Sequence, residues 1–134
     1  PLNEAVVFYS MWNEAIKNVS KPSKAYSDAF HKKFNDAPTT YFGPLAYTNI
    51  MIVANAIKKA GTVEKAALIK ALEATSYDSP TGDKFVFGKS KFINHQAYAS
   101  PKIMQWQKGK VVVIWPFNIA TGKLLYPFPA WDKR

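Results

Sequence analysis

Residues 39–61, TTYFGPLAYTNIMIVANAIKKAG, place two adjacent aromatic residues directly before an apolar helix. Pro44 suits the first turn of that helix, and Gly61 suits its end because glycine adopts the left-handed conformation without strain. The residues between them are apolar on most sides, which predicts a deeply buried helix. Tyr41 and Phe42 therefore either pack against the core or line a site at the positive end of the helix.

The predicted start of this helix favours an anion. If Gly43 is the N-cap and Pro44 the first helical residue, the amides of Leu45 and Ala46 have no acceptor within the helix. Glycine has no capping side chain, so these amides are left for water or a ligand. A helix N-terminus attracts a carboxylate, and aromatic neighbours can cover a small apolar body. From spacing alone, core packing of the aromatic pair is the stronger interpretation.

Two further helices are expected on either side of this one. Pro22 suits the first turn of the earlier helix, where apolar residues at three- and four-residue steps form one stripe for the core. The members of that stripe are Ala25, Tyr26, Ala29, Phe30 and Phe34. Thr62 is expected to cap a later helix over residues 63–75, which should pack beside the helix before it. The three helices are expected to pack together.

The remaining segments are predicted to be extended. The apolar run 5–9 predicts a short, largely buried strand, and one turn of helix is expected in the polar connection after it. Residues 76–101 are rich in Gly, Pro, Ser and Asp, with one short extended piece at 84–87. The turn Lys108-Gly109 between two apolar runs predicts a hairpin. Residues 116–134 contain three prolines and should form an extended tail over the surface.

Charge and composition narrow the possible functions. The chain has 134 residues, which suits one domain, and a net charge of +9, which is compatible with nucleic acid, an anionic surface or solubility. Lysines and phenylalanines interleave in residues 84–92, as in single-strand binders, namely Lys84, Lys89 and Lys91 with Phe85, Phe87 and Phe92. A half-buried strand with exposed lysines gives the same pattern, and the other basic residues are dispersed. Nucleic-acid binding is therefore the alternative hypothesis.

Residues for catalysis or metal binding are sparse. Gly82 and Gly88 are separated by five residues, whereas a phosphate-binding loop requires four. His31 is expected to be solvated on a helix, and His95 to make a structural hydrogen bond in a loop. The absence of cysteine excludes thiolate ligands, and no carboxylates or histidines have metal-ligand spacing. The sequence predicts a binding protein that is not an enzyme, without cofactor or metal.

Several motifs, taken in their order along the chain, resemble those of a known protein family. FHKKFNDAPTTYFGPLAYTNIMIVANAIKKAGTVEKAALIKAL (30–72) is followed by SPTGDKFVF (79–87), NHQAY (94–98), QWQKGKVVVIWP (105–116) and YPFPAW (126–131). This ordered set resembles the late region of the branched-chain amino acid and amide substrate-binding proteins of bacterial ABC transporters. The phenylalanine pair of the first helix, the tyrosine of the second and the ending AIKKAG are typical of that region.

This resemblance implies an α/β fold: the C-terminal part of a type I periplasmic binding protein, with two Rossmann-like lobes around a cleft. It implies a strand near a hinge at about 1–12, helices of the first lobe at 13–75, a return into the second lobe at 76–115 and the tail at 116–134. The members of the family are longer, so most of the pocket is expected in an N-terminal part, and the opening strand and the hairpin are expected to need partners there. The lack of a recognisable signal peptide agrees with this expectation.

The resemblance also implies a function. Such proteins capture an amino acid, an amide or a related carboxylate by hinge closure and deliver it to a membrane permease, in the periplasm or, with a membrane anchor, outside a Gram-positive cell. By its distance from Tyr47, Phe42 matches the aromatic residue that contacts the side chain of the ligand, with Tyr41 beside it. Tyr9 and Ser10 follow the strand that leads to a hinge and are further candidates. The resemblance thus favours a cleft position for Phe42 over core packing.

Overall fold

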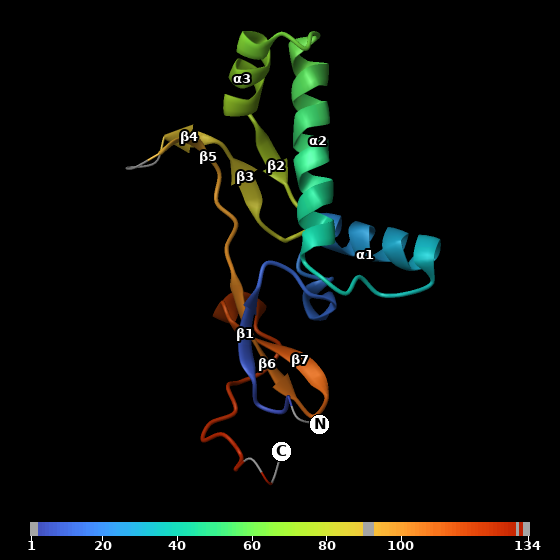
Figure 1. Ribbon diagram of the computed structural model, residues 1–134, viewed down its shortest axis with the longest axis vertical. Coiled ribbons are helices and arrows are strands. Elements are labelled where there is room, and N and C mark those ends of the chain that lie inside the picture. The colour runs from blue at the N-terminus through green and yellow to red at the C-terminus, as the bar shows by residue number, and fades with distance from the viewer. Residues whose placement is uncertain (1–2, 90–92, 131, 133–134) are drawn as a thin grey trace.

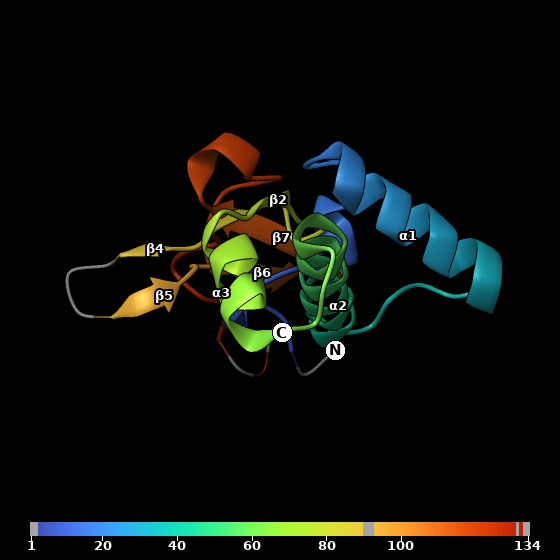
Figure 2. The ribbon, with the colours of Figure 1, turned by 90° about the horizontal axis from the view of Figure 1, so that it is seen from above.

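The computed structural model describes residues 3–89, 93–130 and 132, which form an elongated molecule (Figure 1). Helices α2 and α3 lie at one end beside the short strands β2 and β3, and strands β1, β6 and β7 lie at the other end with the tail. Helix α1 extends sideways between these two ends. Seen from above, α1 and the strands β4 and β5 project to opposite sides of α2 and α3 (Figure 2).

All three predicted helices are confirmed. They are α1 (Lys21–Phe34), α2 (Phe42–Ala60) and α3 (Lys65–Glu73). Helix α2 ends at Gly61 with a φ of 66°, the left-handed conformation expected of a terminating glycine. The prediction that Thr62 caps α3 is wrong, because the cap position is Glu64. The Thr62 hydroxyl instead accepts a hydrogen bond from the Glu64 amide at 3.2 Å.

The predicted deep burial of α2 is also wrong. Its buried residues follow a four-residue step along a single face, and they are Pro44, Thr48, Ile52 and Ala56. On the other faces Ile50 is 69% exposed and Val53 is 48% exposed. Helix α2 packs against α3, whereas α1 reaches it through the rings of Tyr26 and Tyr47, so the three helices do not form one bundle.

Helix α1 buries two serines and only part of its apolar stripe, of which Tyr26 packs against the core. Ser23 and Ser27 are fully buried, whereas Phe34 from the predicted stripe is 55% exposed. Ser27 donates to both carboxylate oxygens of Glu14, which lies in the short helix η1 (Glu14–Ile16). Partial burial pushes the pKa of Glu14 upward, but hydrogen bonds from His31, Lys17 and Ser27 outweigh this effect and hold the pKa below its ordinary value of 4.5. These bonds fix which face of α1 points inward.

Strands β1 (Val7–Ser10), β6 (Lys102–Gln107) and β7 (Lys110–Trp115) form an antiparallel sheet in the order β1-β6-β7. The predicted hairpin is confirmed, with Lys108 and Gly109 at φ values of 53° and 73° as a type I′ turn requires. The expectation that the opening strand lacks a partner in this chain is wrong, because β1 pairs with β6. Its predicted burial is wrong as well, since Val7 is 42% exposed.

The core lies where η1 covers one face of this sheet. Its buried members are Trp12, Ile16, Met104 and Val113. Met104 is opposite Phe8 in β1 and opposite Val113 in β7, so the three strands contribute to the same face. The helical turn expected after the first strand is confirmed by η1, which covers this core.

Residues 76–101 contain more strands than the one extended piece that was predicted. Strands β2 (Ser76–Asp78) and β3 (Lys84–Val86) pair with each other, as do β4 (Gly88–Lys89) and β5 (Asn94–Gln96). Of the residues proposed to contact nucleic acid, Lys91 and Phe92 lie outside the described residues. In β3, Phe85 is buried, as expected for a half-buried strand.

The tail is extended over the sheet, as predicted, after a short helix η2 (Phe117–Ile119). Gln105 from β6 is fully buried and binds the tail on the outer face of the sheet. Its side chain accepts from the Leu125 amide at 2.8 Å and donates to the Leu125 carbonyl at 3.2 Å. This pair of bonds replaces strand pairing for a segment in which prolines remove backbone donors.

Candidate functional site

The start of α2 presents an aromatic pair at the waist of the molecule. We use "waist" for the first turns of α2, the turn 79–83 and the start of β6 at Lys102, where the two ends of the molecule meet (Figure 1). The rings of Tyr41 and Phe42 stack with centroids 4.5 Å apart and planes at 31°. Tyr41 packs against the core cluster, whereas Phe42 is 65% exposed. One aromatic ring thus anchors the pair, and the other is available for contact.

The helix begins two residues earlier than the sequence indicates. Tyr41 occupies the cap position, so Phe42 and Gly43 are the first helical residues and Pro44 is the third. The Leu45 amide donates to the Tyr41 carbonyl at 3.3 Å, and the expectation that this amide is free is therefore wrong. The amides of Phe42 and Gly43 instead precede the first intrahelical hydrogen bond, beside the exposed ring.

Tyr26 from α1 fixes the position of this first turn. A Cβ atom at Gly43 would overlap the hydroxyl oxygen of Tyr26. The Tyr26 ring also meets Trp12 edge-on at 5.7 Å and Tyr47 at 5.9 Å. Burial raises the pKa of the Tyr26 hydroxyl. Gly43 is therefore required by the close approach of a tyrosine from the neighbouring helix.

We expect Gly43→Ala to lower the free energy of unfolding by about 1–3 kcal/mol, the usual cost of overpacking. The added methyl group must displace either the Tyr26 side chain or the start of α2. Urea unfolding of the variant measures this loss. The double variant Gly43→Ala, Tyr26→Phe removes the overlapping oxygen and should recover most of the stability. An equal loss in the single and double variants would contradict this explanation.

The other two predicted site residues do not join the aromatic pair. Side chains alternate along β1, so Phe8 and Ser10 face the core while Tyr9 points to the opposite face of the sheet, where it is 62% exposed. Ser10 is buried, and its hydroxyl donates to the Trp12 carbonyl at 2.6 Å. The structure therefore groups Tyr41 with Phe42 and places Tyr9 and Ser10 apart from them.

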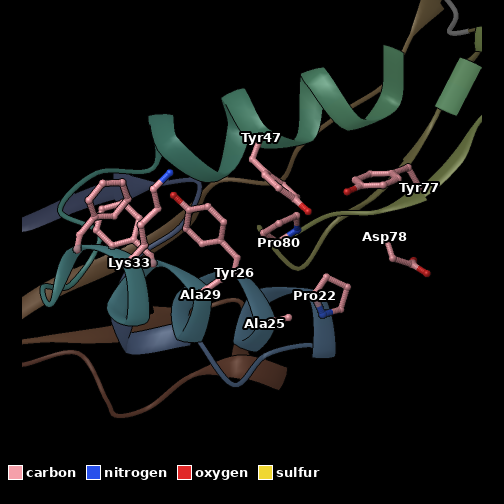
Figure 3. A pocket seen from close by; sticks show the side chains of 11 residues that line it. Pro22, Ala25, Tyr26, Ala29, Lys33, Tyr47, Tyr77, Asp78 and Pro80 are labelled. Atoms are coloured by element: carbon pink, nitrogen blue, oxygen red, sulfur yellow. The ribbon is translucent and has the colours of Figure 1, made fainter. Parts of the chain in front are cut away.

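An apolar groove of about 480 Å³ separates α1 from α2 and β2 (Figure 3). Its floor includes the stripe of α1 that was expected in the core. The hydroxyl groups of Tyr47 and Tyr77 point toward one another, and Pro80 lies beside Tyr47. Burial, and then the neighbouring Tyr47, raise the pKa of the Tyr77 hydroxyl. Periodicity reveals such a stripe but not whether a neighbouring element covers it, so the sequence could not identify the groove.

A chain of buried polar side chains crosses the waist, and the sequence analysis missed it. Its members, which we call the relay, are Thr48 from α2, Ser79, Thr81 and Asp83 from the turn after β2, and Lys102 from β6. Successive members are 2.8, 3.0, 2.8 and 2.8 Å apart. The side chains of Lys102 and Asp83 are only 4% and 12% exposed. The segment SPTGD indicates a turn, but nothing local shows that its side chains bind α2 and β6.

The described part of the chain contains neither a metal-binding cluster nor a membrane-spanning helix. Within residues 3–89, 93–130 and 132, no group of three potential ligands among His, Asp and Glu could hold a metal ion. None of the helices described has the length and apolar character needed to cross a membrane. His31 and His95, expected to be solvated and structural, contact Glu14 and Glu73 at 3.0 and 2.8 Å.

Comparison with known families gives one match of broad extent. The model of the family described as "Periplasmic binding protein" matches residues 3–110. In structure, the chain is similar to a leucine binding protein, LivK, from Thermotoga maritima, with a TM-score of 0.67 and 18% sequence identity. That likeness covers 83% of this chain and 30% of the LivK chain. It confirms the predicted α/β fold as part of a periplasmic-binding-protein fold.

Two curated relatives are similar in sequence. Leu/Ile/Val-binding protein homolog 7 of Brucella abortus is 27% identical over 105 residues, which are 76% of this chain and 26% of that protein. The leucine-, isoleucine-, valine-, threonine-, and alanine-binding protein of Pseudomonas aeruginosa is 36% identical over 61 residues, which are 46% of this chain and 16% of that protein. The chain thus spans about a quarter of the length of the Brucella protein.

Proposed function

The chain belongs to the periplasmic binding protein family, as the sequence motifs indicated, and from this premise we propose that it forms part of the solute site of a bacterial ABC importer. The proposed solute is a branched-chain amino acid, as the names of the relatives suggest, or a related small amide or carboxylate, as the resemblance implied. Because the chain spans about a quarter of the length of the Brucella relative, the site is assigned to the whole protein that carries these residues.

One observation carries the proposal: the exposed ring of Phe42 lies at the start of α2, at the waist. An apolar ring beside the free amides of a helix N-terminus suits a solute with an apolar side chain and a carboxylate. Tyr41 supports the ring by stacking and is itself held by the core. The arrangement offers binding contacts, and the proposed role is capture of the solute without chemical change.

The mechanism proposed for the whole protein is closure of two lobes over the solute, followed by delivery to a membrane permease. The polypeptide crosses the waist after β1 and returns to the same sheet at β6, so two crossings lie close together (Figure 1). The proposed location is the periplasm or the outer face of a Gram-positive cell. Tyr9 and Ser10 are weaker candidates for residues that line the cleft.

The alternative, binding of nucleic acid, makes a different prediction. Phosphate contacts release counterions, so the affinity of such a complex falls steeply as salt is raised. Binding of a small zwitterion to an aromatic wall depends much less on salt. A salt-sensitive complex with single-stranded DNA, together with no response to amino acids, would contradict the importer function.

We expect Phe42→Ala to weaken the binding of L-leucine by the whole protein by about 1–3 kcal/mol, the scale of one apolar contact removed from water. Isothermal titration calorimetry measures this change. Because Phe42 is 65% exposed in the structure, thermal unfolding of the free protein should change little.

Ile50→Ala is the matched control, since Ile50 is 69% exposed on the same helix but lies two turns beyond the pair. It should bind L-leucine as the parent does. Unchanged affinity with lowered stability in Phe42→Ala would return that residue to a packing role.

A further inference from the structure

The relay is a buried polar feature that the proposed site does not use directly. Thr48 and Thr81 have no exposed surface, and Ser79 and Lys102 are 1% and 3% exposed. Burying so many polar groups is unfavourable unless each is bonded, and here each one is. The relay therefore favours one geometry of its parts, because separating them breaks these bonds.

The relay connects helix α2 at one end with the sheet of β1, β6 and β7 at the other. At one end, the Thr48 hydroxyl donates to the Pro44 carbonyl at 2.7 Å, in the turn of α2 that starts with the aromatic pair. At the other end, Lys102 is paired in register with Ser10 of β1. The turn between them is closed by its own bonds, from the Ser79 amide to the Asp83 carbonyl at 2.9 Å and from the Thr81 amide to the Ser79 hydroxyl at 3.1 Å.

The Thr48–Ser79 contact is the one hydrogen bond of the relay that can be removed without leaving the turn 79–83 unsatisfied. Three hydroxyl groups, each with one proton, serve four contacts: Thr48 with the Pro44 carbonyl, Thr48 with Ser79, Ser79 with Thr81, and Thr81 with Asp83. One of the four contacts therefore lacks a proton. Thr48 donates to the Pro44 carbonyl and Thr81 donates to Asp83, so Ser79 donates either to Thr48 or to Thr81. Removing the Thr48 hydroxyl leaves two protons for two contacts in the turn, so the turn stays satisfied while α2 is released.

We infer that the relay positions the first turn of α2, and with it Phe42, against the sheet of β1, β6 and β7. Thr48 and Ser79 are the positioning residues, because the contact between their hydroxyl groups connects α2 to the turn 79–83. The consequence for the solute rests on the proposed function: an aromatic wall that is loosely held binds less tightly, since it must be ordered on binding.

Two spin labels test the positioning directly. The chain has no cysteine, so Lys58→Cys near the end of α2 and Lys110→Cys in β7 introduce unique attachment sites at exposed positions. Pulsed electron paramagnetic resonance then gives the distribution of label distances. Thr48→Val, which keeps the shape and removes the hydroxyl, should broaden or shift this distribution, and Thr48→Ser, which keeps the hydroxyl, should leave it unchanged. An unchanged distribution in Thr48→Val overturns the inference.

Titration of the whole protein with L-leucine provides the second readout. Thr48→Val should weaken binding by about two- to tenfold, the range of one buried neutral hydrogen bond. Thr48→Ser should bind as the parent does. Ala71→Gly, at a buried position of α3 away from the relay and from the aromatic pair, controls for general destabilisation and should keep the parent affinity. Failure of the parent to bind L-leucine contradicts the proposed solute, whereas the label distances still decide the positioning role.

Discussion

Replacing Lys102 by methionine is expected to lower the free energy of unfolding by about 3–5 kcal/mol, because it leaves the Asp83 carboxylate buried without its partner. The two groups lie 2.8 Å apart, with side chains only 4% and 12% exposed. Asp83 keeps hydrogen bonds from the Thr81 hydroxyl and the Ser100 amide, but neither carries a charge. The loss therefore reflects an uncompensated charge rather than the intrinsic strength of the pair.

Urea unfolding at neutral pH measures this loss, and the chain contains a matched control. Lys24 and Asp28 form a pair at 2.6 Å in α1 whose side chains are both 58% exposed. Lys24→Met should cost about 0–1 kcal/mol, as is usual for surface ion pairs. The double variant Lys102→Met, Asp83→Leu should be more stable than Lys102→Met alone, since it removes the stranded charge. Similar losses at positions 102 and 24 would contradict the buried-charge explanation.

Local patterns predicted the elements of the fold well. The three helices follow from apolar spacing and from terminating residues such as Gly61, and the hairpin follows from Lys108-Gly109 between two β-rich runs. These features depend on residues a few positions apart, which a sequence displays directly. The aromatic pair at the start of α2 was also found from local spacing, although the cap lies two residues before the position predicted.

Burial and long-range pairing could not be predicted in the same way. The stripe of α1 has the spacing of a core face, yet hydrogen bonds from Trp12 and to Glu14 turn the adjacent, serine-bearing face inward. Helix α2 has the composition of a buried helix, yet 12 of its 19 residues are exposed. Both outcomes depend on which partner is present, and composition reports only that a partner would be favourable.

The candidate site likewise contains features that local sequence predicts and features that it does not. Tyr41 and Phe42 are neighbours in sequence, so their proximity required no tertiary information. Tyr9 is removed from them by strand alternation, which follows once the face of β1 that carries Phe8 is known to be the core face. The relay runs from Thr48 to Lys102, which are 54 positions apart in sequence. The hydroxyl groups that connect them are common in any turn. Such contacts are visible only in three dimensions.

Trp12→Ala is expected to lower the free energy of unfolding by about 3–5 kcal/mol, the usual cost of truncating a large buried aromatic residue. Trp12 is 1% exposed and belongs to the core cluster between η1 and the sheet. Its indole nitrogen donates to the Ser23 hydroxyl at 2.8 Å, and its ring meets Tyr26 edge-on. One residue thus joins the sheet to α1, and its loss both opens a cavity and frees the helix.

Two conservative variants separate these contributions in the same urea unfolding experiment. Trp12→Phe keeps most of the ring and removes the donor, so it should cost less than Trp12→Ala. Ser23→Ala leaves the buried indole N–H without its acceptor and should cost about 1–3 kcal/mol. If that bond orients α1, combining Trp12→Phe with Ser23→Ala should cost less than the sum of the two, because both remove the same interaction. Strictly additive losses would show that the packing of the ring alone holds α1 against the sheet, and that the serine-bearing face is turned inward by Glu14.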